Sequence, residues 1–231
     1  MEILQIETEV LPAAVVDVPE RLNLGRSNLN FDGLLKGDGL KIEEDGGAAG
    51  CGGKLWPAGE MLAYYLLRKG IQSYPRVLEI GSGTGLTGLA IALSESAPPN
   101  LKVWVTDQEN MIPLMNQNIE LNNLQDKVVA EVLDWGEELP EFLEGQPVDL
   151  VLAADCVYLE SAFPLLEKTL IDLSNKDTKI LMSYKKRRKA DSRFFKSVKK
   201  HFTIVEISDF EEHARFKKDG VTLMELKKKT K

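Results

Sequence analysis

The 231-residue sequence predicts a doubly wound α/β fold, with a mostly parallel seven-stranded sheet that ends in a C-terminal antiparallel hairpin. Three observations predict this fold. Short apolar segments alternate with segments of helical periodicity. The last two apolar segments have no clear helical pattern between them, which indicates a hairpin. A glycine-rich turn directly follows the first main strand, as in open α/β sheets that bind a ligand beyond their strand ends.

The individual elements follow from apolar runs and their bounding turn residues. Strands are expected at residues 76–80, 101–106, 128–133, 148–154, 179–184, 202–207 and 221–226. Helices are expected at residues 56–69, 86–93, 111–122, 162–173 and 191–200. Pro57 suits the first turn of the first helix, and Gly70 follows its end. Because strands and helices alternate, right-handed crossovers and parallel strands are expected.

The N-terminal part has a different character. Residues 1–25 are apolar and acidic without helical period, and residues 33–53 are dense in glycine, with one short strand expected at residues 40–43. We predict that residues 1–53 form an arm and a glycine-rich segment that pack on the core, and that residues 54–231 form the main domain. Such a glycine-rich loop is usually a surface connection, and a lid over a site is the alternative.

Composition narrows the class of protein. Apolar residues make up 43% of the chain and charged residues 28%, as in ordinary globular proteins. No apolar run approaches the roughly 18 residues of a membrane span, and the N-terminus is acidic where a signal peptide is basic. Cytoplasmic localisation and no membrane contact are therefore expected. The only cysteines are Cys51 and Cys156, and the only histidines are His201 and His213, so no metal site is expected.

The net charge of −7 is unevenly distributed. Residues 185–231 contain 16 Lys and Arg against 7 Asp and Glu, and the rest of the chain contains 13 against 29. An acidic body favours a basic partner, so nucleic-acid binding is not expected there. The basic run at residues 185–189 usually indicates a solvated face, with contact to RNA or to an acidic protein patch as alternatives. A monomer is expected.

The strongest chemical signal is Glu79-Ile80-Gly81-Ser82-Gly83-Thr84-Gly85, directly after the first main strand. Glycines there allow a sharp turn and a close ligand, and the next helix directs its N-terminus at the same place. Residues 83–88 also fit the dinucleotide pattern G-x-G-x-x-G. Glu79 favours S-adenosylmethionine over NAD, because a carboxylate repels a pyrophosphate but attracts the ammonium group of a methionine moiety.

Two further strand ends carry residues suited to adenosine. Asp107 ends the second strand, where a carboxylate accepts hydrogen bonds from ribose hydroxyls. This interaction fits NAD and S-adenosylmethionine alike. Trp135 follows the third strand, in Asp134-Trp135-Gly136, where an indole can pack against adenine. The sequence thus predicts an adenosyl ligand at this edge of the sheet.

Together these motifs resemble a known family. Lys54-Leu55-Trp56-Pro57-Ala58-Gly59, the glycine turn, Asp134-Trp135-Gly136, Ala153-Ala154-Asp155-Cys156-Val157-Tyr158 and the segment 183–191 resemble the seven-β-strand protein-lysine methyltransferases of family 16. The resemblance covers roughly residues 31–231. It implies a Rossmann-like class I methyltransferase domain that transfers a methyl group from S-adenosylmethionine to a lysine of a folded protein. The branch it resembles most acts on translation elongation factor 1-alpha.

The resemblance also implies site residues. Those expected to contact the methyl donor by position are Trp56, Gly81, Ser82, Gly83, Asp107, Trp135 and Ala154, and Glu79 joins them by the charge argument above. Asp155 and Tyr158 match an Asp-x-x-Tyr motif at the substrate entrance. We expect Asp155 to orient the substrate amine and Tyr158 to form a wall and a hydrogen bond.

Three other functions are considered. The first is methylation of RNA or a small molecule. It is disfavoured because Asp155-Cys156-Val157-Tyr158 lacks the two prolines common in amino-base methyltransferases. The second is an NAD-linked reductase. The third is a non-catalytic binding module, since a fold does not fix a function.

Overall fold

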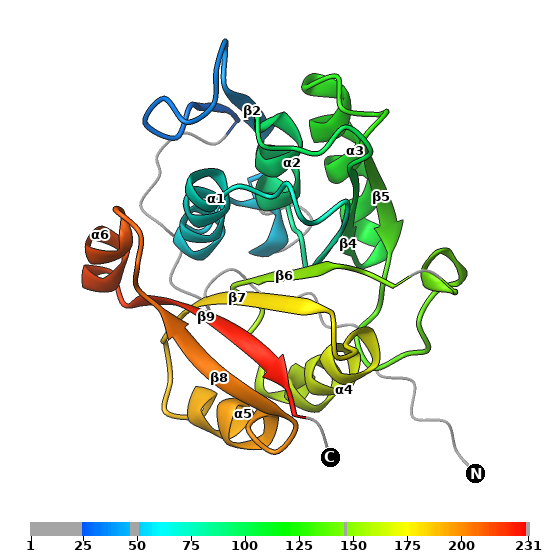
Figure 1. Cartoon of the computed structure of the whole chain (residues 1–231), viewed down its shortest axis with the longest axis vertical. Coiled ribbons are helices and arrows are strands. Elements are labelled where there is room, and N and C mark those ends of the chain that lie inside the picture. Colours follow the sequence, from blue (N-terminus) through cyan, green and yellow to red (C-terminus); the bar gives the residue numbers. More distant parts are fainter. Residues whose placement is uncertain (1–24, 47–50, 146, 230–231) are drawn as a thin grey trace.

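The computed structural model describes residues 25–46, 51–145 and 147–229 (Figure 1). The strands are β1 (Arg26–Leu29), β2 (Leu40–Glu43), β3 (Arg76–Ile80), β4 (Lys102–Asp107), β5 (Val128–Val132), β6 (Leu150–Ala154), β7 (Lys179–Lys185), β8 (Phe202–Ile207) and β9 (Val221–Lys228). The α-helices are α1 (Pro57–Lys69), α2 (Leu86–Leu93), α3 (Ile112–Leu121), α4 (Phe163–Leu173), α5 (Asp191–Val198) and α6 (His213–Lys218). Short 3-10 turns are η2 (Cys51–Gly53), η3 (Glu109–Met111), η4 (Glu141–Leu143) and η5 (Glu160–Ala162).

The main sheet has seven strands in the order β5-β4-β3-β6-β7-β9-β8. The first five run parallel, whereas β9 pairs antiparallel with both β7 and β8. The predicted fold class and C-terminal hairpin are therefore confirmed. The last strand inserts beside β7 and leaves β8 at the edge. Strand β1 and helix α6 were not predicted from the sequence.

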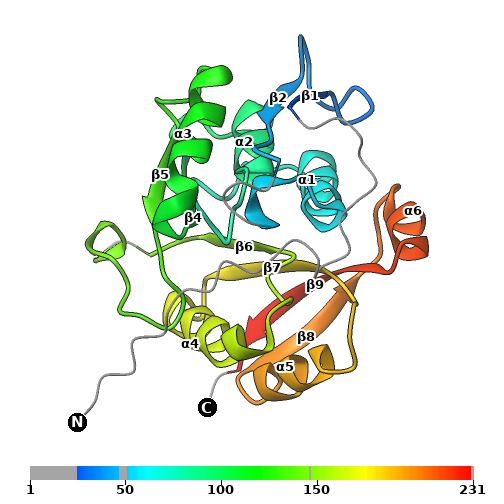
Figure 2. The ribbon, with the colours of Figure 1, turned by 180° about the vertical axis from the view of Figure 1, so that it is seen from behind.

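Helices cover both faces of the sheet. Helices α1, α2 and α3 lie on one face and α4 and α5 on the other (Figures 1 and 2). Two apolar clusters match these layers, the first around Met61, Leu89 and Met115 and the second around Leu166 and Phe194. The central strands are apolar at almost every position because both of their faces are buried, as is usual in parallel sheets.

The N-terminal segment packs on the first of these layers through strand β2. Leu40 and Ile42 of β2 are fully buried. Two asparagines bond to the β2 backbone: Asn118 of α3, whose Oδ1 accepts from Glu43 N at 2.7 Å, and Asn122 directly after α3, whose Oδ1 accepts from Lys41 N at 2.9 Å. Strand β2 pairs with β1, and the two asparagine amides bond to backbone groups of β2 that a second strand would otherwise take. Strand β2 is therefore fixed without joining the main sheet.

The predicted division of the chain at residue 53 stays a prediction. The strand expected at residues 40–43 is confirmed as β2. Most of the expected N-terminal arm, residues 1–24, lies outside the described residues. Within the described ranges, none of the helices combines the length and the apolar character needed to cross a membrane.

Candidate functional site

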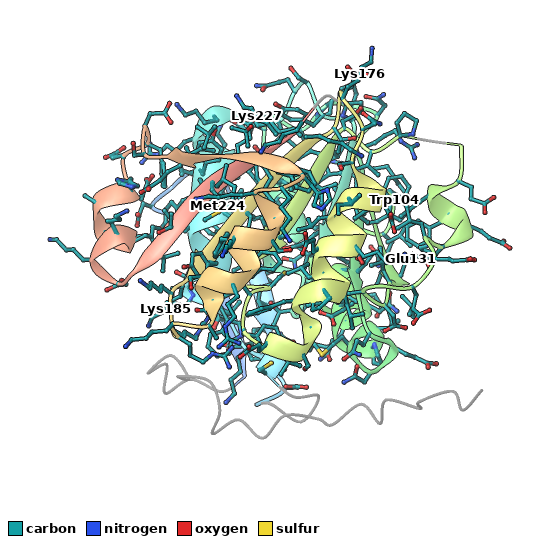
Figure 3. The ribbon with its side chains drawn as sticks, turned by 90° about the horizontal axis from the view of Figure 1, so that it is seen from below. Trp104, Glu131, Lys176, Lys185, Met224 and Lys227 are labelled. Carbon is teal, nitrogen blue, oxygen red and sulfur yellow. The ribbon has the colours of Figure 1, made fainter. Side chains whose placement is uncertain are left out.

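Sheet register brings the predicted site residues to one edge. Strand β3 lies between β4 and β6, and Ile80 pairs with Thr106 on one side and Ala153 on the other. The carboxyl ends of these three parallel strands therefore meet. In Figure 3, Lys185 at the carboxyl end of β7 lies at the opposite edge of the sheet from Lys176, which precedes that strand. Residues that follow β3, β4, β6 and β7 consequently surround one location.

The glycine turn after β3 requires glycine for two separate reasons. Gly81, Gly83 and Gly85 have φ angles of 59°, 56° and 79°, in the left-handed region that other residues rarely adopt. A Cβ atom at Gly81 would lie 2.8 Å from Cζ2 of Trp135, and one at Gly83 would lie 2.5 Å from the carbonyl oxygen of Gly52. The turn, at the N-terminus of α2, is thus packed closely against Trp135 and the Gly52 backbone, and only glycine fits there.

Glu79, near the end of β3, and Ser82 of the turn both bond inside the protein. Glu79 is 2% exposed, and its Oε2 accepts a hydrogen bond from Gly88 N at 2.9 Å. Burial raises the pKa of Glu79 to about 7. Ser82 Oγ donates to the carbonyl oxygen of Glu79 at 3.0 Å and accepts from Thr106 N at 2.9 Å. Both side chains therefore stabilise the turn, and their contacts with a ligand stay predictions.

Asp107 connects the second strand to the same turn. Its Oδ2 accepts from Gly83 N at 2.8 Å, and its Oδ1 accepts from Gln108 N at 2.8 Å. Burial raises the pKa of Asp107 above its ordinary value. The carboxylate thus lies beside the glycine backbone, as expected for a group that accepts from ribose hydroxyls.

Trp135 forms one side of the glycine turn. Its indole approaches Gly81 closely enough to exclude a Cβ atom there. The segment that carries Trp135, after β5, is fixed by α4. Gly136 N donates to Thr169 Oγ1 at 2.9 Å, and a Cβ atom at Gly136 would lie 2.5 Å from Leu165 Cδ2. The structure therefore brings Trp135 and the turn together, as the sequence predicts.

Ala154 and Asp155 form the opposite side of the site. Ala154 ends β6, and its Cβ lies 4.0 Å from the position that a Cβ atom of Gly59 would take on α1. Asp155 has a φ angle of 59°, which is unusual for a residue with a side chain. Its backbone nitrogen donates to Ser183 O at 2.8 Å. Left-handed backbone at a carboxylate is the type of strain that is often found at functional positions.

The segment before α1 covers the glycine turn. Trp56 precedes Pro57, and its Nε1 donates to the carbonyl oxygen of Cys51 at 2.9 Å. The Tyr158 hydroxyl shares a hydrogen bond with the Cys51 thiol, and burial raises the pKa of both groups. Trp56 and Tyr158 therefore meet through Cys51, a residue that the sequence analysis left outside the site.

Arg187 is the second residue that the sequence analysis missed. It belongs to the basic run 185–189, for which a solvated face was one expectation. Lys186 and Lys189 are exposed as expected, but the Arg187 side chain is only 9% exposed and forms an ion pair with Asp155. No signal in the run separates this arginine from its neighbours. In the parts of the chain that the structure describes, no cluster of three or more His, Cys, Asp or Glu side chains could hold a metal ion.

Comparison with solved structures identifies the fold. The SAH-bound Podospora anserina methyltransferase PaMTH1 superposes with a TM-score of 0.51 at 17% identity, over 74% of this chain and 78% of that one. The mitomycin 7-O-methyltransferase MmcR gives a TM-score of 0.55 at 13% identity, over 75% of this chain and 53% of that one. Both likenesses support the class I methyltransferase fold.

Comparison with sequences identifies the family. A family model described as lysine methyltransferase matches residues 34–201. The protein-lysine N-methyltransferase EFM6 of Saccharomyces cerevisiae is 47% identical, over 90% of this chain and 93% of that protein. The protein N-lysine methyltransferase METTL21A of Xenopus tropicalis is 33% identical, over 73% and 76%. The EEF1A lysine methyltransferase 3 of the same species is 31% identical, over 69% of each.

These matches remove the NAD-linked reductase and the non-catalytic module from the alternatives. They confirm S-adenosylmethionine as the methyl donor, whereas the individual residues assigned to it stay predictions. The chain belongs to the lysine methyltransferase family and is an S-adenosylmethionine-dependent protein-lysine N-methyltransferase.

Proposed function

We propose that this enzyme methylates a lysine side chain of translation elongation factor 1-alpha, that it does so as a monomer in the cytoplasm, and that it does not bind nucleic acid. The Xenopus relative named for EEF1A supports this substrate, as does the resemblance of the segment 183–191. The acidic N-terminal four-fifths of the chain suits a basic protein partner.

One observation carries the proposed site. Asp107 ends β4 and Asp155 follows β6, and these are the two strands on either side of β3 and its glycine turn. A ligand seated on the turn therefore has a carboxylate at each side. Asp107 suits the ribose hydroxyls of the adenosyl group, and Asp155 suits the amine that accepts the methyl group.

The residues present fit S-adenosylmethionine. The left-handed glycine turn lies at the N-terminus of α2, and Trp135 offers an aromatic surface beside Gly81. The residues that we assign to the donor are Trp56, Glu79, Gly81, Ser82, Gly83, Asp107, Trp135 and Ala154. When bound, the donor supplies an activated methyl group on a sulfonium centre, so the protein's task is positioning.

The substrate amine must be neutral to accept the methyl group, although a free lysine titrates near pH 10.4. Burial in an apolar channel disfavours the charged form. We assign to Asp155 the role of orienting the amine and later accepting its proton. Tyr158 keeps its hydroxyl protonated, because burial raises the pKa of this phenol, and so it serves as a wall and hydrogen-bonding group.

The test is methylation of the purified elongation factor with labelled donor, followed by mass spectrometry of its lysines. We expect the wild type to modify a lysine and Asp155→Ala to bind donor normally but lose methyl transfer. Asp126→Ala is the matched control, because Asp126 is an exposed acid that precedes β5, away from the strand ends that form the site. Normal turnover by Asp155→Ala would contradict the proposed site.

The relatives reported above are named as protein-lysine methyltransferases, and labelling of cell lysate tests directly whether protein is the substrate class here. Cell lysate is incubated with labelled donor and then digested with protease or with ribonuclease, which shows whether protein or RNA carries the label. Label that is released by ribonuclease and resists protease would contradict a protein substrate. Absence of label on the elongation factor, with label on another protein, would contradict only the proposed target.

A further inference from the structure

Arg187 binds Asp155 with both of its terminal nitrogens. Nη1 donates to Oδ1 at 2.7 Å, and Nη2 donates to Oδ2 at 2.7 Å. The two side chains are 9% and 7% exposed, so the pair is shielded from solvent. A bidentate arginine–carboxylate pair of this length is among the strongest charge-assisted interactions in proteins, and it fixes the carboxylate plane as well as its position.

The local backbone is arranged around this pair. Lys185 N also donates to Asp155 Oδ1 at 3.1 Å, so the end of β7 contributes a third bond. Arg187 N donates to Asp191 Oδ2 at 3.0 Å, and Asp191 is 1% exposed at the start of α5. The guanidinium is therefore held at its backbone by α5 and at its tip by Asp155. An arginine fixed at both ends loses little freedom when it orients its partner.

Arg187 also contacts the segment that covers the glycine turn. Its guanidinium carbon lies 5.3 Å from the ring centroid of Trp56, within range of a cation–π interaction. Trp56 is one of the residues assigned to the methyl donor. Arg187 thus joins the carboxylate on the substrate side to an aromatic ring on the donor side.

The charge of this arginine bears on the chemistry. A buried carboxylate without a partner would favour an ammonium group beside it and so raise the pKa of the substrate lysine. Methyl transfer requires the neutral amine. The positively charged guanidinium of Arg187, bonded to both oxygens of Asp155, offsets this rise in the pKa of the lysine. The carboxylate can still accept a hydrogen bond from the amine.

We infer that Arg187 is a positioning residue for methyl transfer: it fixes the Asp155 carboxylate and offsets its charge, so that the substrate lysine reacts as a neutral amine. The inference rests on the proposed function, in which Asp155 meets that amine. It assigns a role to one member of a basic run whose exposed neighbours Lys186 and Lys189 do not share it.

The other titratable groups near the pair come from several elements. The thiol of Cys156 experiences the charges of Asp155, Asp107 and Glu79, and the thiol of Cys51 experiences those of Asp107 and Arg187. Burial raises the pKa values of both thiols and of Tyr158, which keeps these groups neutral below about pH 9.

The remaining groups near the pair are carboxylates and basic side chains. Asp191, at the start of α5, bonds to the backbone of Arg187. Its Oδ1 also lies 3.7 Å from Nε of Arg188, and the side chains of Lys185, Lys186 and Lys189 complete the basic run. Burial raises the pKa of Glu79 to about 7, and Arg187 is not among the groups that shift this pKa. Comparison of variants with the wild type therefore isolates the effect of Arg187.

The test is the pH dependence of kcat on the elongation factor, with saturating donor and substrate. In Arg187→Gln we expect kcat at pH 7.5 to fall at least about 10-fold. The acid limb of the plot of kcat against pH should move up by about 1 pH unit, because the unpaired carboxylate favours the charged lysine. In Arg187→Lys the charge remains, so the limb should stay in place while kcat falls, because an ammonium cannot bind both oxygens in the same plane. Lys189→Gln, the matched control, should change neither quantity.

Several results would overturn the inference. One is a fall in the kcat of Arg187→Gln by the same factor at every pH, which would indicate a packing role only. A second is an acid limb that shifts equally in Arg187→Lys, and a third is full activity of that variant. If Arg187→Gln does not fold, as judged by loss of a cooperative urea unfolding transition, Arg187→Lys still decides the positioning role. Asp155→Ala is measured in parallel: normal turnover there contradicts the proposed site, whereas an inactive Asp155→Ala with an unshifted Arg187→Gln contradicts only the role of Arg187.

Discussion

The carboxylate of Glu79 accepts a hydrogen bond from the backbone nitrogen of Gly88 at 2.9 Å, and this bond ties the end of β3 to the first turn of α2. Glu79 is almost fully buried, and burial raises its pKa from an ordinary value of 4.5 to about 7. In the unfolded chain the same carboxyl titrates near its ordinary value. Between these two pH values the folded protein retains a proton that the unfolded chain releases, so stability falls as pH rises through this window.

Glu79→Gln tests this linkage. Glutamine keeps an acceptor for Gly88 N and cannot ionise. Between pH 4.5 and 8, we expect the free energy of unfolding of the wild type to fall by about 3 kcal/mol relative to that of the variant. Urea denaturation of both proteins across this range measures the difference. If the free energies of unfolding of the two proteins change with pH in parallel, the buried carboxyl has an ordinary pKa.

Gly81→Ala tests the glycine turn as the donor site. The new Cβ atom would meet Trp135, and the φ angle of 59° is unfavourable for alanine. We expect donor affinity, measured by calorimetry, to fall at least about 10-fold, with a loss of stability of about 1–2 kcal/mol. Gly220→Ala is the matched control, because Gly220 has a φ angle of 75° and no atom within 4 Å of its Cβ position. Unchanged donor affinity in Gly81→Ala would refute the assignment of this turn.

Asp107→Asn tests the ribose contact. The asparagine retains one acceptor oxygen for Gly83 N but loses the charge and the second oxygen. We expect donor affinity to fall about 10- to 30-fold, which corresponds to about 1.4–2 kcal/mol. The matched control is Asp126→Asn, because Asp126 is an exposed acid that precedes β5, at the other end of the sheet. If both variants bind donor equally well, Asp107 does not contact the ribose.

The fold was predictable because its signals are local. Apolar runs marked each of the seven main strands, and Pro57 and Gly70 bounded the first helix as α1 confirms. Strand β1 and helix α6 were missed. The first is a short polar segment that pairs only with β2, and the second is a six-residue helix with one buried side chain, Phe216. Neither has enough apolar periodicity to stand out from a loop.

The site was predictable only where backbone geometry fixes the residue type. The glycines of the turn and the acids at strand ends could be placed from the sequence, because each directly follows or ends a predicted strand. Contacts between distant segments do not: Asn118 bonds both Glu43 and Thr84, and Arg187 bonds Asp155, across 32 residues in the latter case. Nothing within residues 185–189 indicates which side chain turns inward, because that choice depends on the register of β7 beside β6.

Tyr158→Phe separates a hydrogen-bonding role of this residue from an acid–base role. The hydroxyl bonds to the Cys51 thiol, and burial raises the pKa of Tyr158 above its ordinary value of 10, so the phenol stays protonated up to at least about pH 9. We expect the variant to bind donor normally and to lose roughly 10-fold in kcat, the cost of one hydrogen bond in the reacting complex. The ratio of wild-type to variant kcat should be the same at pH 7 and pH 9. A ratio that changes across this range would mean that Tyr158 ionises during turnover and acts as a base, because a neutral phenol contributes equally at both pH values.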